Sequence, residues 1–297
     1  MRGDFVTATA MLMLWAGDAS RAAEKTFERV VPAEAHGTVE ISNVSGSIEV
    51  SGWERPEVSV RAELGDDVER VEVSSDHGHT TIKVMLAHHT SRDGDARLHV
   101  QVPKDSELSI SAVSADVTTA GMQGKQRISA VSGDVTAELE GSDLDLKTVS
   151  GNVKLKGHGE PARLHVTSVS GDVRLEHGAG ELEAGTVSGN LVVSLDNARS
   201  VRVRSTSGDL RFEGKLARGA DFDASTVSGD LTVHADAEGG YVYEALTFSG
   251  QIDNCFQVVP SEHSHGPGRS LQGNRGEGVG RLRLKSMGGD IHLCDHP

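Results

Sequence analysis

The stretch VSGDVTAELEGSDLDLKTVSGNVKL, residues 131–155, decides the fold because it contains one complete period of a repeat. Its opening phrase returns as VSGNV at 149, VSGDV at 169, VSGNL at 187, TSGDL at 206 and VSGDL at 227. The central glycines, 18 to 21 residues apart, are Gly133, Gly151, Gly171, Gly189, Gly208 and Gly229. A period of this length indicates one supersecondary unit per repeat, stacked on its neighbours.

Within each period the residues alternate as in β-strands. Leu144, Leu146 and Thr148 share one parity, whereas Val149 and Val153 share the other. Side chains alternate across a strand, so two successive inward residues, Thr148 and Val149, require a bend between them. The glycine that follows either has positive φ or lets a neighbouring unit approach closely, and the sequence leaves both open.

Units of this length are too short to close alone, but they can stack in parallel. We therefore predict an all-β fold, a parallel β-helix (β-solenoid) with less regular N-terminal rungs. The alternative is an antiparallel β-meander in which the Ser-Gly pairs are hairpin turns. The solenoid predicts one buried column of residues two positions after the glycines: Val135, Val153, Val173, Leu191, Leu210 and Leu231.

Three segments follow from composition. Residues 1–23 resemble a signal peptide, with Arg2, an apolar stretch over 6–16 and small residues at Ser20 and Ala22. Residues 24–112 read as an irregular N-terminal β region of the same domain. Residues 113–297 read as the regular solenoid, with a surface loop rich in Gly, Ser, His and Pro inserted at 260–280.

The charge of the chain restricts its partners. Lys and Arg total 29 against 44 Asp and Glu, a net charge of −15, which opposes binding to nucleic acid and to anionic lipid surfaces. Beyond the signal peptide no stretch reaches the ~20 apolar residues of a membrane span. We predict an exported protein of the periplasm or cell envelope, whose partner is an unknown envelope polymer or a protein.

A polar residue follows most repeat glycines. Stacking would align them in one ladder: Asp134, Asn152, Asp172, Asn190, Asp209 and Asp230. Such a ladder could bind cations or sugar hydroxyls. Alternatively, Asp and Asn suit turns and cap backbone groups. Two charges ~5 Å apart in water repel by under ~1 kcal/mol, so the ladder needs no metal, and we predict no metal and no cofactor.

The histidines do not form a metal motif in the sequence. His77 and His79 flank a turn, His88 and His89 follow the next strand, and the predicted loop contains His263 and His265. None of these sets guarantees the three or four converging ligands that a metal needs. No phosphate-binding glycine loop or nucleophile elbow occurs either, so we predict no catalytic residues.

Cys255 and Cys294 each lie five residues after a glycine, Gly250 and Gly289. If the loop between them is excluded from the coil, their rungs are neighbours and the Cα atoms lie ~5 Å apart, within disulfide range. We predict a disulfide that staples the C-terminal end of the array, where the last rung has a neighbour on one side only. Two free thiols are the alternative.

The repeats, the Val-Pro-Lys-Asp-Ser at 102–106, the Ser-Gly-Trp at 51–53 and the export signal together resemble the bacterial "putative adhesin" family of glycine-rich β-repeat domains, also called toastrack domains. The resemblance implies an envelope-associated β-helical domain and supplies no catalytic residues. Two function classes remain. The first is a non-enzymatic envelope scaffold or binding protein, and the second is a carbohydrate-active β-helix enzyme with carboxylates, or Arg and Lys residues, clustered on one face. Acidic residues are spread along the repeats, which favours the first.

Overall fold

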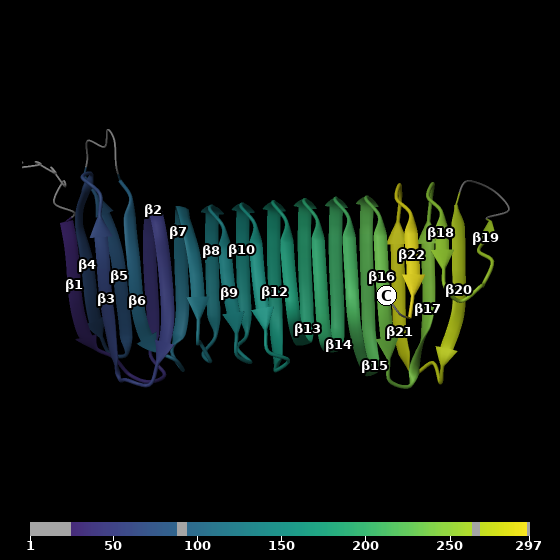
Figure 1. Ribbon diagram of the computed structural model, residues 1–297, viewed down its shortest axis with the longest axis horizontal. Coiled ribbons are helices and arrows are strands. Elements are labelled where there is room, and N and C mark those ends of the chain that lie inside the picture. Colours follow the sequence, from purple (N-terminus) through teal and green to yellow (C-terminus); the bar gives the residue numbers. More distant parts are fainter. Residues whose placement is uncertain (1–24, 88–93, 263–267, 296–297) are drawn as a thin grey trace, which may run out of the picture.

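The computed structural model describes residues 25–87, 94–262 and 268–295, which form one long row of strands (Figure 1). Within these ranges the chain forms 22 β-strands and no helix. The strands up to the end of the irregular region are β1 (Lys25–Pro32), β2 (Thr38–Trp53), β3 (Glu57–Leu64), β4 (Val68–Asp76), β5 (His79–Leu86), β6 (Ala96–Pro103) and β7 (Glu107–Ala120). The predicted signal peptide, residues 1–23, lies outside the described residues.

The repeat region continues the row. Its strands are β8 (Gln126–Ser132), β9 (Val135–Leu139), β10 (Leu144–Ser150), β11 (Val153–Gly157), β12 (Pro161–Ser170), β13 (Val173–Ser188), β14 (Leu191–Ser207), β15 (Leu210–Ser228) and β16 (Leu231–Ala237). The C-terminal strands are β17 (Gly240–Thr247), β18 (Ile252–Asn254), β19 (Ser261–Glu262), β20 (Arg269–Gly276), β21 (Gly280–Ser286) and β22 (Ile291–Cys294). Among the described residues, no helix is long and apolar enough to cross a bilayer.

Each repeat rung has one strand segment before its Ser-Gly-Asp or Ser-Gly-Asn bend and one after it. Strand β8 leads into the bend at Gly133 and β9 leaves it. The two do not pair with each other. Instead β8 pairs with β10, and β9 with β11, both in parallel. The segments before the bends thus form one parallel sheet, the pre-bend sheet, and those after them form the post-bend sheet. The parallel solenoid is confirmed, and the antiparallel meander is wrong for these rungs.

The predicted buried column is present in register. Val153 is opposite Val135 on one side and Val173 on the other, and the pairing continues through Leu191, Leu210 and Leu231. Each of these side chains is at most 2% exposed. Burial of an aliphatic side chain stabilises by roughly 1.5–3 kcal/mol, so each residue of the column stabilises the stacking of its own rung.

The core lies between the two sheets. Phe212 of the post-bend sheet packs edge-to-face on Phe222 of the pre-bend sheet, with ring centroids 4.7 Å apart. Elsewhere the core is mostly Val, Leu, Ile and Ala, as the scarcity of aromatic residues requires. Small aliphatic residues keep the two sheets close, so the rung needs only short turns.

Five of the six repeat glycines, all but Gly229, meet both conditions that the sequence left open. Gly151 has a φ of 125°, a conformation that side-chain-bearing residues rarely adopt. A Cβ atom placed on Gly151 would also overlap the carbonyl oxygen of Gly133 on the preceding rung. Any other residue would therefore both strain the bend and push the rungs apart.

The N-terminal end is closed by antiparallel strands. Strand β2 pairs in parallel with β7 on one side and with β5 and β6 on the other. Beyond them, β4 runs antiparallel to β5, β3 to β6, and β1 to β3. Such capping protects the open edge of a parallel array from pairing with another chain.

The C-terminal end departs from the order of the sequence. Strand β21 lies between β15 and β17, and β22 lies between β16 and β18. In Figure 1 the yellow strands β21 and β22 accordingly lie among green strands. The prediction that the last rung has a neighbour on one side only is wrong. After β16 the chain leaves one rung position empty, builds β17 and β18, and then returns to fill the gap.

The interval 260–280, predicted as a surface loop, contains strands β19 and β20. They lie between β18 and β21 in the sequence, where the chain turns back towards the gap. Arg269–Gly276 is strand β20, which runs antiparallel to β17 over its whole length, and β19 pairs with β20. A lone β17 edge would expose unpaired backbone groups, and β20 satisfies them. The interval therefore caps the array at this end.

Candidate binding surface

The six polar residues predicted to form a ladder do so at the bends. The Oδ1 atom of Asp134 accepts a hydrogen bond from the backbone N–H of Asn152 at 2.8 Å. The same contact links each successive pair, from Asp116 to Asp134 at 2.9 Å up to Asp209 and Asp230 at 3.0 Å. One side-chain oxygen of each ladder residue is thus committed to holding the next rung. Ligand binding at the ladder stays a prediction.

The valine two positions before each glycine faces outward, contrary to the prediction for Val149. Val149 is 48% exposed, whereas Thr148 beside it is buried. Burial alternates from Leu144 to Val149, Ser150 is exposed as well, and the change of side is complete at Val153, after the bend at Gly151 and Asn152. The result is a row of exposed apolar side chains along the molecule.

This row and the neighbouring outward row of the pre-bend sheet form a surface that we call the bend strip. Parallel register aligns each row across seven rungs. The apolar row comprises Val149, Val169, Val187, Thr206, Val227, Met287 and Phe248; the second row comprises Lys147, Thr167, Gly185, Arg204, Ser225, Lys285 and Leu246. At ~4.8 Å per rung the strip is about 29 Å long.

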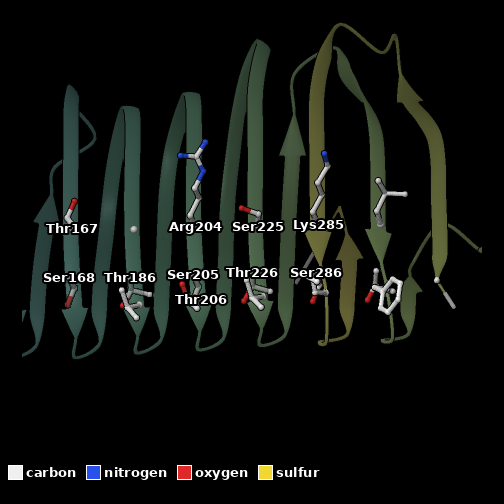
Figure 2. Close-up of a pocket in the computed structure, with 18 residues that line it drawn as sticks. Thr167, Ser168, Thr186, Arg204, Ser205, Thr206, Ser225, Thr226, Lys285 and Ser286 are labelled. Atoms are coloured by element: carbon white, nitrogen blue, oxygen red, sulfur yellow. The ribbon is translucent and has the colours of Figure 1, made fainter. Parts of the chain in front are cut away.

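A hollow of about 1000 Å³ occupies the C-terminal part of the bend strip. It extends from Thr167 to Phe248 and includes Gly185, where the second row lacks a side chain. Figure 2 shows Arg204 and Lys285 in the same row, with their side chains extending in the same direction. The lining contains no acidic residue.

The two cations of the hollow are available for a ligand. Arg204 and Lys285 are exposed, and neither has an ion-pair partner in the part of the chain that the structure describes. Lys147, further along the strip, contacts Asp145 at 3.8 Å. In a chain of net charge −15, a strip with cations and no carboxylate is a local reversal of charge.

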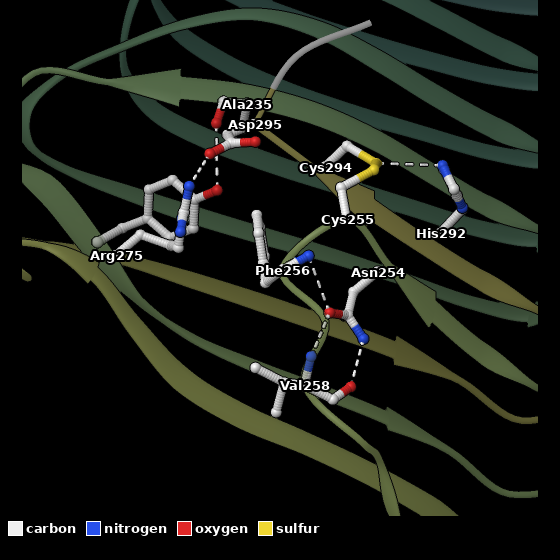
Figure 3. The surroundings of a disulfide bond; sticks show 10 residues. Ala235, Asn254, Cys255, Phe256, Val258, Arg275, His292, Cys294 and Asp295 are labelled. Carbon is white, nitrogen blue, oxygen red and sulfur yellow. Dashed lines mark hydrogen bonds and ion pairs between the residues drawn. A yellow bond between two sulfur atoms is a disulfide. The ribbon is translucent and has the colours of Figure 1, made fainter.

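The disulfide between Cys255 and Cys294 is present, with Cα atoms 5.0 Å apart. It joins Cys294 on β22 to Cys255 in the turn after β18. Strands β18 and β22 are adjacent, as predicted. Asn254 holds this turn through hydrogen bonds from the N–H groups of Phe256 and Val258, and the Arg275 guanidinium lies 4.6 Å from the ring centroid of Phe256 (Figure 3). Arg275 also pairs with Asp295.

The histidines named from the sequence form no metal cluster within the described ranges. His77 is near Asp76, and His79 is near Glu40, both at 3.4 Å and both exposed. His88, His89, His263 and His265 lie outside the described residues. The structure instead brings together His234, His292 and Cys294, whose potential ligand atoms lie within 4.8 Å of one another.

Sequence reasoning missed this second set, although a usable pattern existed. His234 lies five residues after Gly229, the same offset that pairs Cys255 with Cys294. This offset places His234 beside Cys255 if the rungs follow the sequence, and beside Cys294 in the order that the structure has.

With this geometry in view, comparison with known proteins defines the class of the chain. The Toastrack DUF4097 family model matches residues 38–293, so the chain belongs to that family. None of the curated proteins matches it.

Two solved structures match over most of this chain. A "putative adhesin" from Parabacteroides distasonis has a TM-score of 0.53 at 10% identity, covering 91% of this chain and 98% of its own. Another from Bacteroides fragilis has a TM-score of 0.41 at 13% identity, covering 90% and 96%. The first likeness, at 10% identity, supports the solenoid fold alone.

Proposed function

We propose that this protein is a non-enzymatic, exported binding protein of the cell envelope, and that its bend strip holds an extended anionic polymer. The observation that carries the proposal is the pairing of an exposed apolar row with a carboxylate-free row that contains Lys147, Arg204 and Lys285. Contiguous exposed apolar surface is uncommon on a soluble protein and marks an interaction site.

The charges around the strip favour a single polymer chain as the ligand over a broad anionic surface such as a membrane. The next outward row of the pre-bend sheet has four carboxylates, Asp145, Glu183, Asp223 and Glu244, against the two guanidinium groups of Arg202 and Arg283, and the polar ladder lies beyond the bend. A membrane would meet these carboxylates together with the strip, whereas a narrow polymer meets the strip alone. The repeat of equivalent positions every ~4.8 Å suits a ligand that is itself repetitive.

The lining of the hollow also favours binding over catalysis. Glycoside hydrolysis requires two carboxyl groups flanking the scissile bond. No Asp, Glu, His or Cys lines the hollow, so its surface lacks the carboxyl pair that hydrolysis requires, and Arg204 and Lys285 are its ionisable groups. The alternative of a carbohydrate-active enzyme predicts release of reducing ends from a bound polymer, and detection of such turnover would contradict this proposal.

Export is supported by two observations. The first is the disulfide, because disulfides persist in oxidising compartments. The second is the sequence of residues 1–23, whose pattern predicts a signal peptide.

The test compares polygalacturonate with its fully methyl-esterified, neutral form by calorimetry on the full chain. We expect binding of the anionic form only, weakened at least tenfold by the double substitution Arg204→Glu and Lys285→Glu. The matched control is Lys154→Glu with Lys156→Glu, the same change of charge on exposed positions of the post-bend sheet.

Equal loss of affinity in the control variant, or equal binding of both polymer forms, would overturn the strip as the site. Failure of both forms to bind would overturn the polymer as its occupant.

A further inference from the structure

A group of potential metal ligands lies at the C-terminal junction, away from the bend strip. Strands β16, β22 and β18 are adjacent in that order. His234 on β16 is the register partner of Cys294 on β22, and Cys255 follows β18 on the other side. His292 lies two residues before Cys294 on the same strand. Three neighbouring rungs therefore bring two imidazoles and two sulfurs to one place.

The distances allow these side chains to converge. One potential ligand atom from each of His234, His292 and Cys294 lies within 4.8 Å of the others. The Nε2 atom of His292 is 3.3 Å from the sulfur of Cys294 (Figure 3), and the two imidazole rings have centroids 5.8 Å apart. Tetrahedral zinc, with bonds of ~2.0–2.3 Å, separates its ligand atoms by about 3.3–3.8 Å, so small side-chain rotations suffice.

His234 has a ring nitrogen that no other group satisfies. Its Nδ1 atom is buried and has no hydrogen-bond partner in the described part of the chain. An unpartnered buried polar atom is costly, and a cation bound at Nδ1 would satisfy it.

The oxidation state of the cysteines controls the donor set. As long as Cys255 and Cys294 form a disulfide, the group offers two imidazoles but no thiolate, the form in which cysteine ligates metals. Cys255 is exposed although Cys294 is buried, so a reductant can reach the bond from the Cys255 side. Reduction would leave two sulfurs beside two imidazoles, which is the Cys₂His₂ set of structural zinc sites.

We propose that reduction of the disulfide creates a site for one thiophilic divalent cation of the zinc type, held by His234, His292, Cys255 and Cys294. A dithiol reductant supplies two electrons and two protons, the S–S bond breaks into two thiols, and the reductant becomes a disulfide. The cation then displaces both thiol protons to solvent and is held by two thiolates and two imidazoles. The metal replaces the covalent staple between β22 and the turn after β18, so that junction stays joined in either redox state.

The test uses the full chain, reduced anaerobically and separated from reductant, and titrated with Co²⁺ alone and then with Zn²⁺. We expect one Co²⁺ per reduced chain, with thiolate charge-transfer bands and the strong visible absorption of a tetrahedral site, displaced by one equivalent of Zn²⁺. The oxidised chain should show none of these bands. Zn²⁺ should also raise the Tm of the reduced protein and leave that of the oxidised protein unchanged.

Variants separate this site from adventitious thiol binding. His234→Ala and His292→Ala should each weaken Co²⁺ binding at least tenfold in the reduced chain. His165→Ala, an exposed histidine on a distant rung, is the matched control and should bind as the unaltered chain does. Unchanged affinity in both ligand variants, or less than stoichiometric binding by reduced protein whose β-type circular dichroism is intact, would overturn the proposal.

Discussion

The central rungs and the C-terminal rungs are built from the same repeat phrase, but the chain passes through them differently. From β8 to β16 each rung stacks on the one before it in sequence. From β16 onward the chain leaves a gap, builds β17 and β18, and fills the gap last with β21 and β22. The phrase therefore specifies the shape of a rung and its register but leaves the order of rungs free, because every rung offers the same edge.

The largest expected effect comes from breaking the feature that both regions share, the buried column. Val153→Asp places an unpaired charge at a position that is 1% exposed, and we expect a loss of about 4 kcal/mol or more in the free energy of unfolding. Urea denaturation followed by circular dichroism measures it. Val149→Asp, on the exposed row of the same rung, is the control and should stay within about 0.5 kcal/mol.

The disulfide distinguishes the C-terminal region from the central one. Replacing Cys255 and Cys294 by Ser opens a loop whose ends are 39 residues apart, and the chain-entropy model gives a loss of about 3–4 kcal/mol. The urea midpoint, measured with a chelator present, should fall equally for this variant and for the reduced protein. A loss below about 1 kcal/mol would show that the intercalated strands hold this end without the bond.

A smaller effect should follow from crowding one bend of the central array. Gly171 has a φ of 117°, and an added Cβ would overlap the carbonyl oxygen of Gly151. Gly171→Ala should therefore destabilise by more than about 1 kcal/mol in thermal unfolding. Gly185→Ala is the control, because the nearest atom, the carbonyl oxygen of Arg204, is 4.0 Å from its added Cβ. Equal Tm values for the two variants would contradict the role assigned to the bend.

The smallest expected effect concerns the polar ladder. Asn152→Ala removes the acceptor for the N–H of Asp172, a bond of 3.2 Å at an exposed bend, and should cost about 1 kcal/mol or less. Amide hydrogen exchange at Asp172 should accelerate in this variant. Ser150→Ala, also exposed at the same bend, should leave that amide unchanged.

Repetition explains which parts of the structure could be predicted from the sequence. Positions with the same offset from a glycine stack in register, so the column through Val153, the ladder through Asn152 and the pair Cys255–Cys294 were predictable. Whether Val149 faces inward or outward was not predictable. A bend before Val149 and a bend at Gly151 produce the same alternation in the rest of the rung. Which cysteine His234 neighbours depends on the order of rungs, which equal edges leave open.

The order of rungs is the central claim, and pairwise cross-linking tests it most directly. Thr232 is the register partner of His292, and His292 is also the partner of Asp253. In a chain with Ser at 255 and 294, the pair T232C and H292C should form a disulfide on mild oxidation, because adjacent strands lie ~4.8 Å apart. The pair T232C and D253C, two rungs apart at about 9.6 Å, should stay reduced. Bridging of 232 with 253 and failure of 232 with 292 would show that the rungs follow the sequence, and would contradict the intercalated end.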